Sequence, residues 1–224
     1  AAQLGAEFAS GTNYAYISAR ARETDPTSFP LPSGTVDFDV PDLGAQIAQY
    51  QADNPTLGSN ALGAIFVGSN DLRDAAFSST PQAVIQSAIQ SIVAGAGQLL
   101  PDFDEVVVFG FPDLGLIPEV TAFGATAAAV ATATAAAANT LLTGTLTATY
   151  GNAVTYFDTF SFFQNIVGNP ADFGFTNTTD PCTDPFVPAL TAPDCTGFVF
   201  YDTLHPTEAG HALLAEAFVE TVGG

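Results

Sequence analysis

The apolar run ALGAIFV, residues 61–67, ends at Gly68 and is followed by the turn-forming residues 69–71. The run has the length of a β-strand and no alternating polar residues, which is typical of a strand that is covered on both faces. Apolar runs of the same kind follow at residues 105–111 and 153–157. Strands of this type belong to parallel sheets, so the sequence predicts a parallel sheet at the centre of the fold.

Segments with helical periodicity separate these strands, and they predict helices at residues 42–53, 80–100, 122–150, 160–167 and 207–221. We also expect residues 13–18 and 198–201 to be extended, and the Pro-, Ser- and Gly-rich residues 25–41 to form a surface loop. Strands that alternate with helices in this way form α/β folds, with helices on both faces of the sheet. We therefore predict a single α/β domain over residues 1–224, with the functional side chains in loops that follow the strands.

The charge of the chain is strongly one-sided, with 23 acidic residues against three basic ones and a formal net charge of −20. Nucleic acid is excluded as a partner because its phosphates require clusters of Lys and Arg, and an anionic membrane surface would repel the chain. The acidic surface serves solubility, while calcium-binding Asp-rich loops are the alternative, although the EF-hand spacing is absent. No apolar run reaches about 18 residues, so we expect no transmembrane segment.

Two cysteines, Cys182 and Cys195, flank a loop rich in Pro, Asp and Thr. Neither lies in a C-x-x-C motif or a Cys/His cluster, so we expect no metal site and no metal cofactor. A disulfide between them would stabilise the fold by about 3 kcal/mol and would imply an oxidising compartment. Two reduced thiols are the alternative.

The segment YDTLHPTEAGH, residues 201–211, contains the residues best suited to acid–base catalysis. Asp202 and His205 are three residues apart on a predicted turn, which can place the carboxylate beside the imidazole and fix its tautomer. Pro206 then opens the terminal helix and holds the turn in place. A chance capping interaction is the alternative for such a pair. His211, the other histidine, lies on the helix and is expected to pack or to face solvent.

The segment GSND, residues 68–71, directly follows the predicted strand at residues 61–67. At such a position the side-chain amide of Asn70 can donate a hydrogen bond to a developing oxyanion, an interaction worth about 3 to 4 kcal/mol. A plain strand-ending turn is the alternative, because Gly, Ser, Asn and Asp are its usual residues.

Together these segments resemble the conserved blocks of the GDSL/SGNH hydrolases. Residues 202–211 are similar to the last block of that family, D-x-x-H-P-[ST]-x-x-G-H, and residues 68–71 to its G-x-N-D block. Residues 111–118, FPDLGLIP, resemble the P-D-L-G-x-x-P turn of the bacterial secreted lipase/esterase branch. Residues 169–182 resemble the loop that precedes the catalytic Asp in that branch. Order and spacing agree from about residue 12 to residue 218.

The resemblance implies a flavodoxin-like three-layer α/β/α fold with a parallel sheet. It also implies that His205 is the general base, that Asp202 is its partner and that Asn70 lies in the oxyanion hole. The expected protein is a secreted or cell-surface serine ester hydrolase, an esterase or lipase that needs no cofactor. Its substrate is a small-molecule or lipid ester, and lipids, acetylated sugars, aryl esters and thioesters all remain open.

The chain departs from this family at the nucleophile, because Gly-Asp-Ser occurs nowhere in it. Residues 13–19, NYAYISA, resemble the block N-[YF]-A-x-G-G-A, but Ile17 and Ser18 stand where glycines are expected. We expect that the first strand of the sheet and its serine lie on an upstream segment that is missing from this chain or separate from it. Ser69 and Ser18 are the alternative nucleophiles.

The rival interpretation is a catalytically inactive scaffold with a structural, adhesive or assembly role. The missing nucleophile motif favours this rival, which predicts self-association and no hydrolysis. The block around Asp202 and His205 favours the hydrolase, which is the interpretation we adopt.

Overall fold

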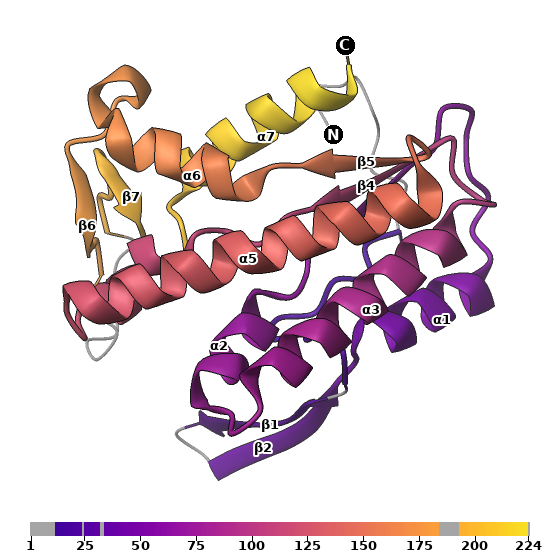
Figure 1. Ribbon diagram of the computed structural model, residues 1–224, viewed down its shortest axis with the longest axis horizontal. Coiled ribbons are helices and arrows are strands. Elements are labelled where there is room, and N and C mark those ends of the chain that lie inside the picture. The colour runs from indigo at the N-terminus through magenta and orange to yellow at the C-terminus, as the bar shows by residue number, and fades with distance from the viewer. Residues whose placement is uncertain (1–11, 24, 32–33, 184–192, 224) are drawn as a thin grey trace. The chain divides into compact units, whose positions relative to one another are not determined.

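The computed structural model describes residues 12–23, 25–31, 34–183 and 193–223 (Figure 1). These residues divide into two compact units. The first unit contains the described residues of Phe8–Phe111 and Ala138–Phe157, and the second contains those of Pro112–Ala137 and Asp158–Gly224. The single domain over residues 1–224 stays a prediction.

The secondary structure alternates between strands and helices along most of the chain. The strands are β1 (Asp25–Leu31), β2 (Gly34–Val40), β3 (Leu62–Ile65), β4 (Glu105–Phe109), β5 (Val154–Phe157), β6 (Asn177–Pro181) and β7 (Phe198–Phe200). The α-helices are α1 (Leu43–Asp53), α2 (Ser69–Phe77), α3 (Pro81–Leu99), α4 (Pro118–Thr121), α5 (Ala125–Tyr150), α6 (Thr159–Gly168) and α7 (Glu208–Val222). Two short 3-10 helices are η2 (Leu114–Leu116) and η3 (Pro170–Phe173).

The first unit is organised around a parallel sheet with the strand order β3-β4-β5. Every residue of the central strand β4 after Glu105 is buried, as the apolar run predicts. Phe109 at the end of β4 packs between Phe66, which follows β3, and Phe157 at the end of β5, with ring centroids 4.7 and 4.9 Å apart. β3 is the edge strand of this sheet among the described residues, and Phe66 is 49% exposed.

Helix α3 packs against β3 and β4, and α1 lies beside α3 (Figure 1). The two helices approach closely at Gly95, where an added Cβ would lie 2.9 Å from Ile47 and from Leu43 of α1. The face of α3 that is turned inward is apolar and includes Ala88, Ile89, Ile92, Val93, Ala96 and Leu99, all buried. The helix predicted at residues 80–100 is therefore confirmed, and the predicted positions Ile89, Ile92 and Val93 lie on its buried face.

Helix α5 begins in the second unit and ends in the first. Threonine disfavours helix, but several of its threonines donate their hydroxyls to the carbonyl four residues earlier, which satisfies the side chain inside the helix. Such bonds link Thr134 to Val130 and Thr145 to Leu141. By length and composition alone, α5 is the one described helix that could cross a membrane. This criterion is weak, because core helices of soluble proteins also meet it.

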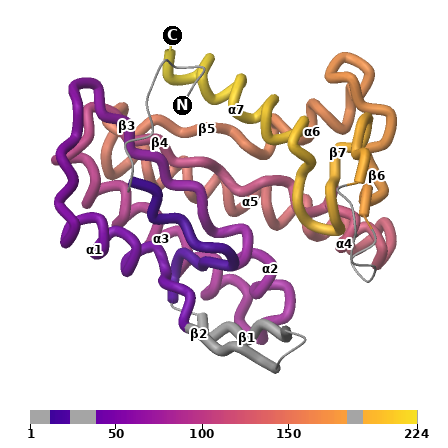
Figure 2. The backbone as a smooth tube through the Cα atoms, turned by 180° about the vertical axis from the view of Figure 1, so that it is seen from behind, coloured from indigo at the N-terminus to yellow at the C-terminus, as the bar shows by residue number. Residues whose placement is uncertain are grey.

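The second unit contains the parallel pair β6 and β7, which lie side by side in both views (Figure 1, Figure 2). A disulfide joins Cys182, after β6, to Cys195, before β7. This confirms the expected disulfide. Helix α7 follows β7 and packs against it.

The α/β fold class and the parallel sheet are confirmed, and two local predictions are wrong. The expected loop at residues 25–41 is wrong for residues 25–31 and 34–40, where β1 and β2 pair as an antiparallel hairpin. The sequence TVDFDV, residues 35–40, alternates apolar and polar residues as a strand does, and the nearby Pro, Ser and Gly residues obscured that pattern. Residues 13–18 are not a strand, because the chain turns at residues 17–18, where the N–H of Ala19 donates to the carbonyl of Tyr16.

Candidate active site

Asp202 and His205 lie on the turn between β7 and α7, and their side chains contact each other. Nδ1 of His205 is 2.8 Å from Oδ2 of Asp202. The other carboxylate oxygen, Oδ1, accepts the main-chain N–H groups of Leu204 at 2.8 Å and of His205 at 2.6 Å. Because an ionised carboxylate only accepts hydrogen bonds, the proton lies on Nδ1, and Nε2 is left as a proton acceptor. The geometry is that of a base and its orienting partner.

The environment of this pair suits a group that meets solvent or a substrate. The side chain of His205 is 60% exposed, and that of Asp202 is 28% exposed. Partial burial acts to raise the pKa of Asp202, but the hydrogen bonds from His205 and Leu204 outweigh it, so the pKa is lowered. Asp202 is therefore ionised at neutral pH, and its negative charge would stabilise a protonated imidazole beside it.

Main-chain contacts fix the turn that carries the pair. The N–H and the hydroxyl of Thr183 both donate to the carbonyl of Tyr201 at 2.8 Å, and the N–H of Tyr201 donates to the carbonyl of His205 at 2.8 Å. The N–H of Glu119, in α4, donates to the carbonyl of Thr203 at 2.8 Å. Thr183 directly follows Cys182, so the disulfide and the turn are neighbours. These supports leave no mark in the sequence, because any residue can supply a main-chain acceptor.

The start of α7 anchors the other end of the turn. Thr207 is buried and caps the helix by accepting the N–H of Gly210 at 3.3 Å. The N–H of Thr207 donates to Val199 at 2.8 Å and its hydroxyl to Phe198 at 2.9 Å. Helix α7, which follows the turn with His205, is thereby tied to β7.

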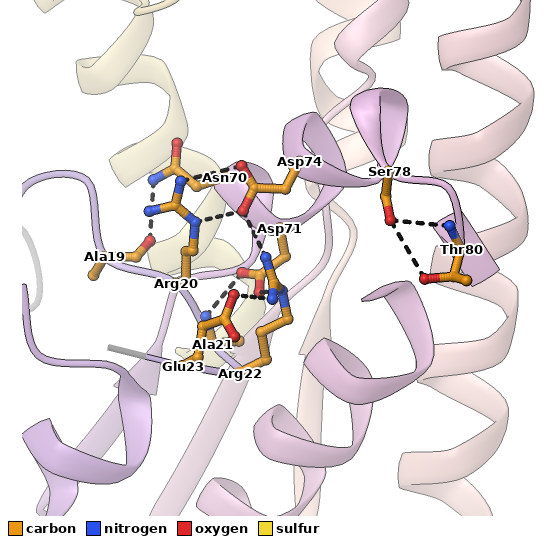
Figure 3. A network of polar contacts seen from close by, with 10 residues as sticks. All are labelled: Ala19, Arg20, Ala21, Arg22, Glu23, Asn70, Asp71, Asp74, Ser78 and Thr80. Atoms are coloured by element: carbon orange, nitrogen blue, oxygen red, sulfur yellow. Dashed lines mark hydrogen bonds and ion pairs between the residues drawn. The ribbon is translucent and has the colours of Figure 1, made fainter. Parts of the chain in front are cut away.

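Asn70 lies in the first unit, in the first turn of α2, directly after β3. Its Nδ2 donates to the carbonyl of Ala19 at 3.0 Å (Figure 3). An amide nitrogen carries two hydrogens, so one N–H remains for a second acceptor. The turn before it requires glycine, because Gly68 has a φ of 109° and an added Cβ would lie 2.4 Å from the ring of Phe111. Residues 68–71 can therefore form a strand-ending turn and still present Asn70 as a hydrogen-bond donor.

The structure brings Asp202 and His205 together within the second unit, whereas Asn70 belongs to the first. The joint action of the three residues stays a prediction. Ser18, also in the first unit, has a φ of 65°, the left-handed conformation that favours glycine. At a position where the sequence resemblance leads us to expect glycine, Ser18 therefore has a backbone conformation that glycine adopts more readily.

Asp113, in the segment FPDLGLIP, is 2% exposed and is fully engaged in hydrogen bonds. Its carboxylate accepts the N–H of Gly115 at 2.9 Å, the hydroxyl of Thr132 at 2.7 Å and the amide of Gln164 at 3.0 Å. These contacts tie the turn after β4 to α5 and α6 inside the second unit. Asp113 therefore has a structural role.

Within the described ranges, no group of three or more His, Cys, Asp or Glu side chains is arranged to hold a metal ion. Asp202 and His205 bind each other, and Asn70 binds the carbonyl of Ala19. The arrangement can take up and release a proton at His205 and can donate a hydrogen bond from Asn70.

The chain matches a family model and is similar to known proteins. A family model described as GDSL-like lipase/acylhydrolase matches residues 1–218. The chain is similar to a thermolabile hemolysin of Vibrio parahaemolyticus, with 34% identity over 85 residues that make up 32% of this chain and 20% of that protein. It is also similar to a GDSL esterase/lipase of Arabidopsis thaliana, with 25% identity over 177 residues, 73% of this chain and 51% of that protein. The chain thus spans about a fifth and about half of the lengths of these relatives.

Proposed function

The chain belongs to the GDSL-like lipase/acylhydrolase family, and we propose that it works as a secreted serine ester hydrolase with His205 as its general base. Family membership supports ester hydrolysis in general terms. The observation that carries the specific proposal is the 2.8 Å contact between Nδ1 of His205 and Oδ2 of Asp202. This contact leaves Nε2 available on a largely exposed imidazole.

The proposed reaction has two steps. In the first, the serine oxygen attacks the ester carbonyl carbon while its proton passes to Nε2 of His205, and the protonated imidazole then gives that proton to the departing alcohol. In the second, water attacks the acyl-enzyme, again losing a proton to His205, which returns it to the serine oxygen as the acid leaves. Asp202 holds the imidazole throughout, and the remaining N–H of Asn70 stabilises the oxyanion of both tetrahedral intermediates.

The nucleophile is proposed to lie on a strand that pairs with the edge of β3 opposite β4, an edge that has no strand partner among the described residues. The run at residues 61–67 has the composition of a strand that is buried in the middle of a sheet, yet Ala64 is exposed and β3 pairs only with β4 among the described residues. Buried parallel strands normally have partners, because unpaired backbone groups are costly. A strand with the sequence Gly-Asp-Ser at its carboxyl end would complete this edge.

The position of this added strand follows from sheet geometry. Neighbouring strands lie about 4.8 Å apart, so the carboxyl end of a parallel strand next to β3 would come within about 5 to 10 Å of the start of α2. Asn70 occupies that start. A serine on the added strand would therefore be beside the proposed oxyanion donor. Ser69 and Ser18 remain the alternative nucleophiles within this chain.

The surroundings proposed for the protein are extracellular. The disulfide between Cys182 and Cys195 is compatible with an oxidising compartment, and the net charge of −20 with a soluble secreted protein. The family supports ester substrates, and we propose small-molecule or lipid esters without choosing among them.

The proposal is tested on the protein isolated with every segment that it carries in nature. Hydrolysis of short-chain p-nitrophenyl esters is measured for the wild type, for His205→Ala and for His211→Gln as the matched control. We expect His205→Ala to lower kcat by about 10³-fold or more and His211→Gln to leave it within about twofold. Unchanged hydrolysis in His205→Ala would remove this residue from the mechanism.

Absence of hydrolysis in the wild type would support the rival interpretation of an inactive scaffold. In that case, sedimentation should reveal self-association, which the structural, adhesive or assembly role requires. Intact mass and N-terminal sequencing of the same sample identify any Gly-Asp-Ser segment that accompanies the chain.

A further inference from the structure

Five charged side chains form a network at the start of α2, next to Asn70 (Figure 3). The outermost of them, Glu23, pairs with Arg22. We call the other four, Arg20, Arg22, Asp71 and Asp74, the α2 clamp. It uses two of the three basic residues in a chain with 23 acidic ones. Cations are therefore concentrated at one site, although most of the acidic residues of the protein lie elsewhere.

The contacts of the α2 clamp join residues 20–22 to the first two turns of α2. Arg20 holds Asp74 with two nitrogens, Nε at 2.5 Å from Oδ2 and Nη2 at 3.1 Å from Oδ1. Nη2 of Arg22 reaches the same carboxylate at 2.7 Å, and its Nε lies 3.2 Å from Oδ1 of Asp71. Paired guanidinium and carboxylate groups of this kind fix orientation as well as position.

Asp71 is the buried centre of the network. Its side chain is 0% exposed, and its Oδ2 accepts the N–H of Ala21 at 2.8 Å. Burial raises the pKa of Asp71. The Ala21 amide and the Arg22 guanidinium act to lower it, but their effect is smaller. Burial acts on Asp74 in the same direction, but Arg20 and Arg22 outweigh it there and its pKa is lowered. A carboxylate is retained in the core of this unit only because it is paired.

The α2 clamp is continuous with the contact that orients Asn70. The carbonyl that accepts Nδ2 of Asn70 belongs to Ala19, the residue before Arg20. Asn70 itself precedes Asp71 on α2. Ala19 is thus bonded directly to Arg20 of the clamp, and Asn70 is bonded directly to Asp71.

We propose that the α2 clamp positions the side-chain amide of Asn70, so that its second N–H points at the oxyanion during ester hydrolysis. The four charged residues are positioning residues and touch no substrate. Preorganised donors stabilise developing charge because they need no rearrangement in the transition state. Loosening the segment at residues 19–22 should therefore slow the chemical step more than it weakens substrate binding. The inference rests on the proposed ester hydrolase function.

The experiment is a double-mutant cycle in the complete natural protein, with kcat and KM measured on a short-chain p-nitrophenyl ester. Asp74→Asn removes the charge shared by Arg20 and Arg22, and Asn70→Ala removes the donor. Asp104→Asn is the matched control, because this exposed carboxylate accepts the N–H of Ala61 at the opposite end of β3. We expect Asp74→Asn to lower kcat about 10- to 100-fold with KM nearly unchanged, and to have little further effect in Asn70→Ala.

Two results separate this inference from the function on which it rests. If Asn70→Ala lowers kcat but Asp74→Asn lowers it by the same factor in both backgrounds, the positioning role is wrong and the hydrolase proposal stands. If Asn70→Ala leaves kcat unchanged, the oxyanion assignment fails and the positioning role fails with it. Should Asp74→Asn not fold, Arg20→Lys replaces it in the cycle, since lysine keeps the charge but loses the two-pronged contact.

Discussion

Replacing Asp202 by Asn tests the role of the carboxylate beside His205 while keeping the shape of the side chain. The amide can adopt two orientations, and neither reproduces the present contacts. With its NH₂ group toward Nδ1, the imidazole must accept at Nδ1 and carry its proton on Nε2, the wrong tautomer for a base. With its oxygen toward Nδ1, the NH₂ group faces the N–H groups of Leu204 and His205, and both hydrogen bonds, at 2.8 and 2.6 Å, are lost.

The expected loss is large in catalysis and small in stability. A wrong tautomer in comparable triads lowers kcat by about 10⁴-fold, which is about 5.5 kcal/mol of transition-state stabilisation. Because His205 is 60% exposed, its contact with Asp202 contributes only about 1 kcal/mol or less to folding. The free energy of unfolding should therefore change little.

The assay measures kcat for a short-chain p-nitrophenyl ester at neutral pH, together with unfolding in urea. Asp158→Asn is the matched control, since this exposed carboxylate caps α6 by accepting the N–H of Ser161 at 3.0 Å and has no histidine beside it. The control should keep full activity. A folded Asp202→Asn protein with kcat within about threefold of the wild type would refute the reasoning.

Three further predictions concern stability. Removing the disulfide by Cys182→Ala and Cys195→Ala should lower the free energy of unfolding by about 3 kcal/mol in a urea titration, and an unchanged midpoint would contradict this. Gly68→Ala should cost about 2 to 4 kcal/mol, measured as a lower Tm, because the φ of 109° is strained for alanine and its Cβ meets an aromatic ring at 2.4 Å. Since the pKa of Asp202 is lowered in the folded state, its contribution to stability is present above about pH 4 and is lost as pH falls through the folded pKa. Unfolding of Asp202→Asn between about pH 6 and about pH 3 should therefore depend less on pH than that of the wild type.

The sequence predicts well those elements that local patterning determines. The apolar run at residues 105–111 becomes the buried strand β4, and the helical spacing at residues 80–100 becomes α3. The hairpin β1–β2 was missed because its Pro, Ser and Gly residues carry a stronger loop signal than the short alternation at residues 35–40. These two segments are strands because they pair with each other, and the sequence of one segment does not show which segment it will pair with.

In the candidate site, too, some contacts could be predicted from the sequence and others could not. The spacing of Asp202 and His205 predicts their contact, because three residues on a turn leave few other arrangements. The supports of the turn could not be predicted, since Thr183 acts through the carbonyl of Tyr201 and any residue supplies a carbonyl. Arg20 offered one signal, as a rare cation in an acidic chain, but its partner Asp74 is 54 residues away in sequence.

The most direct test of the account is to react the natural protein with a fluorophosphonate, which forms a covalent adduct with an activated serine, and to map the labelled residue by mass spectrometry. We predict a single adduct on the serine of a Gly-Asp-Ser segment, formed in the wild type and suppressed in His205→Ala. An adduct on Ser18 or Ser69, or one that forms equally fast in His205→Ala, would contradict the account.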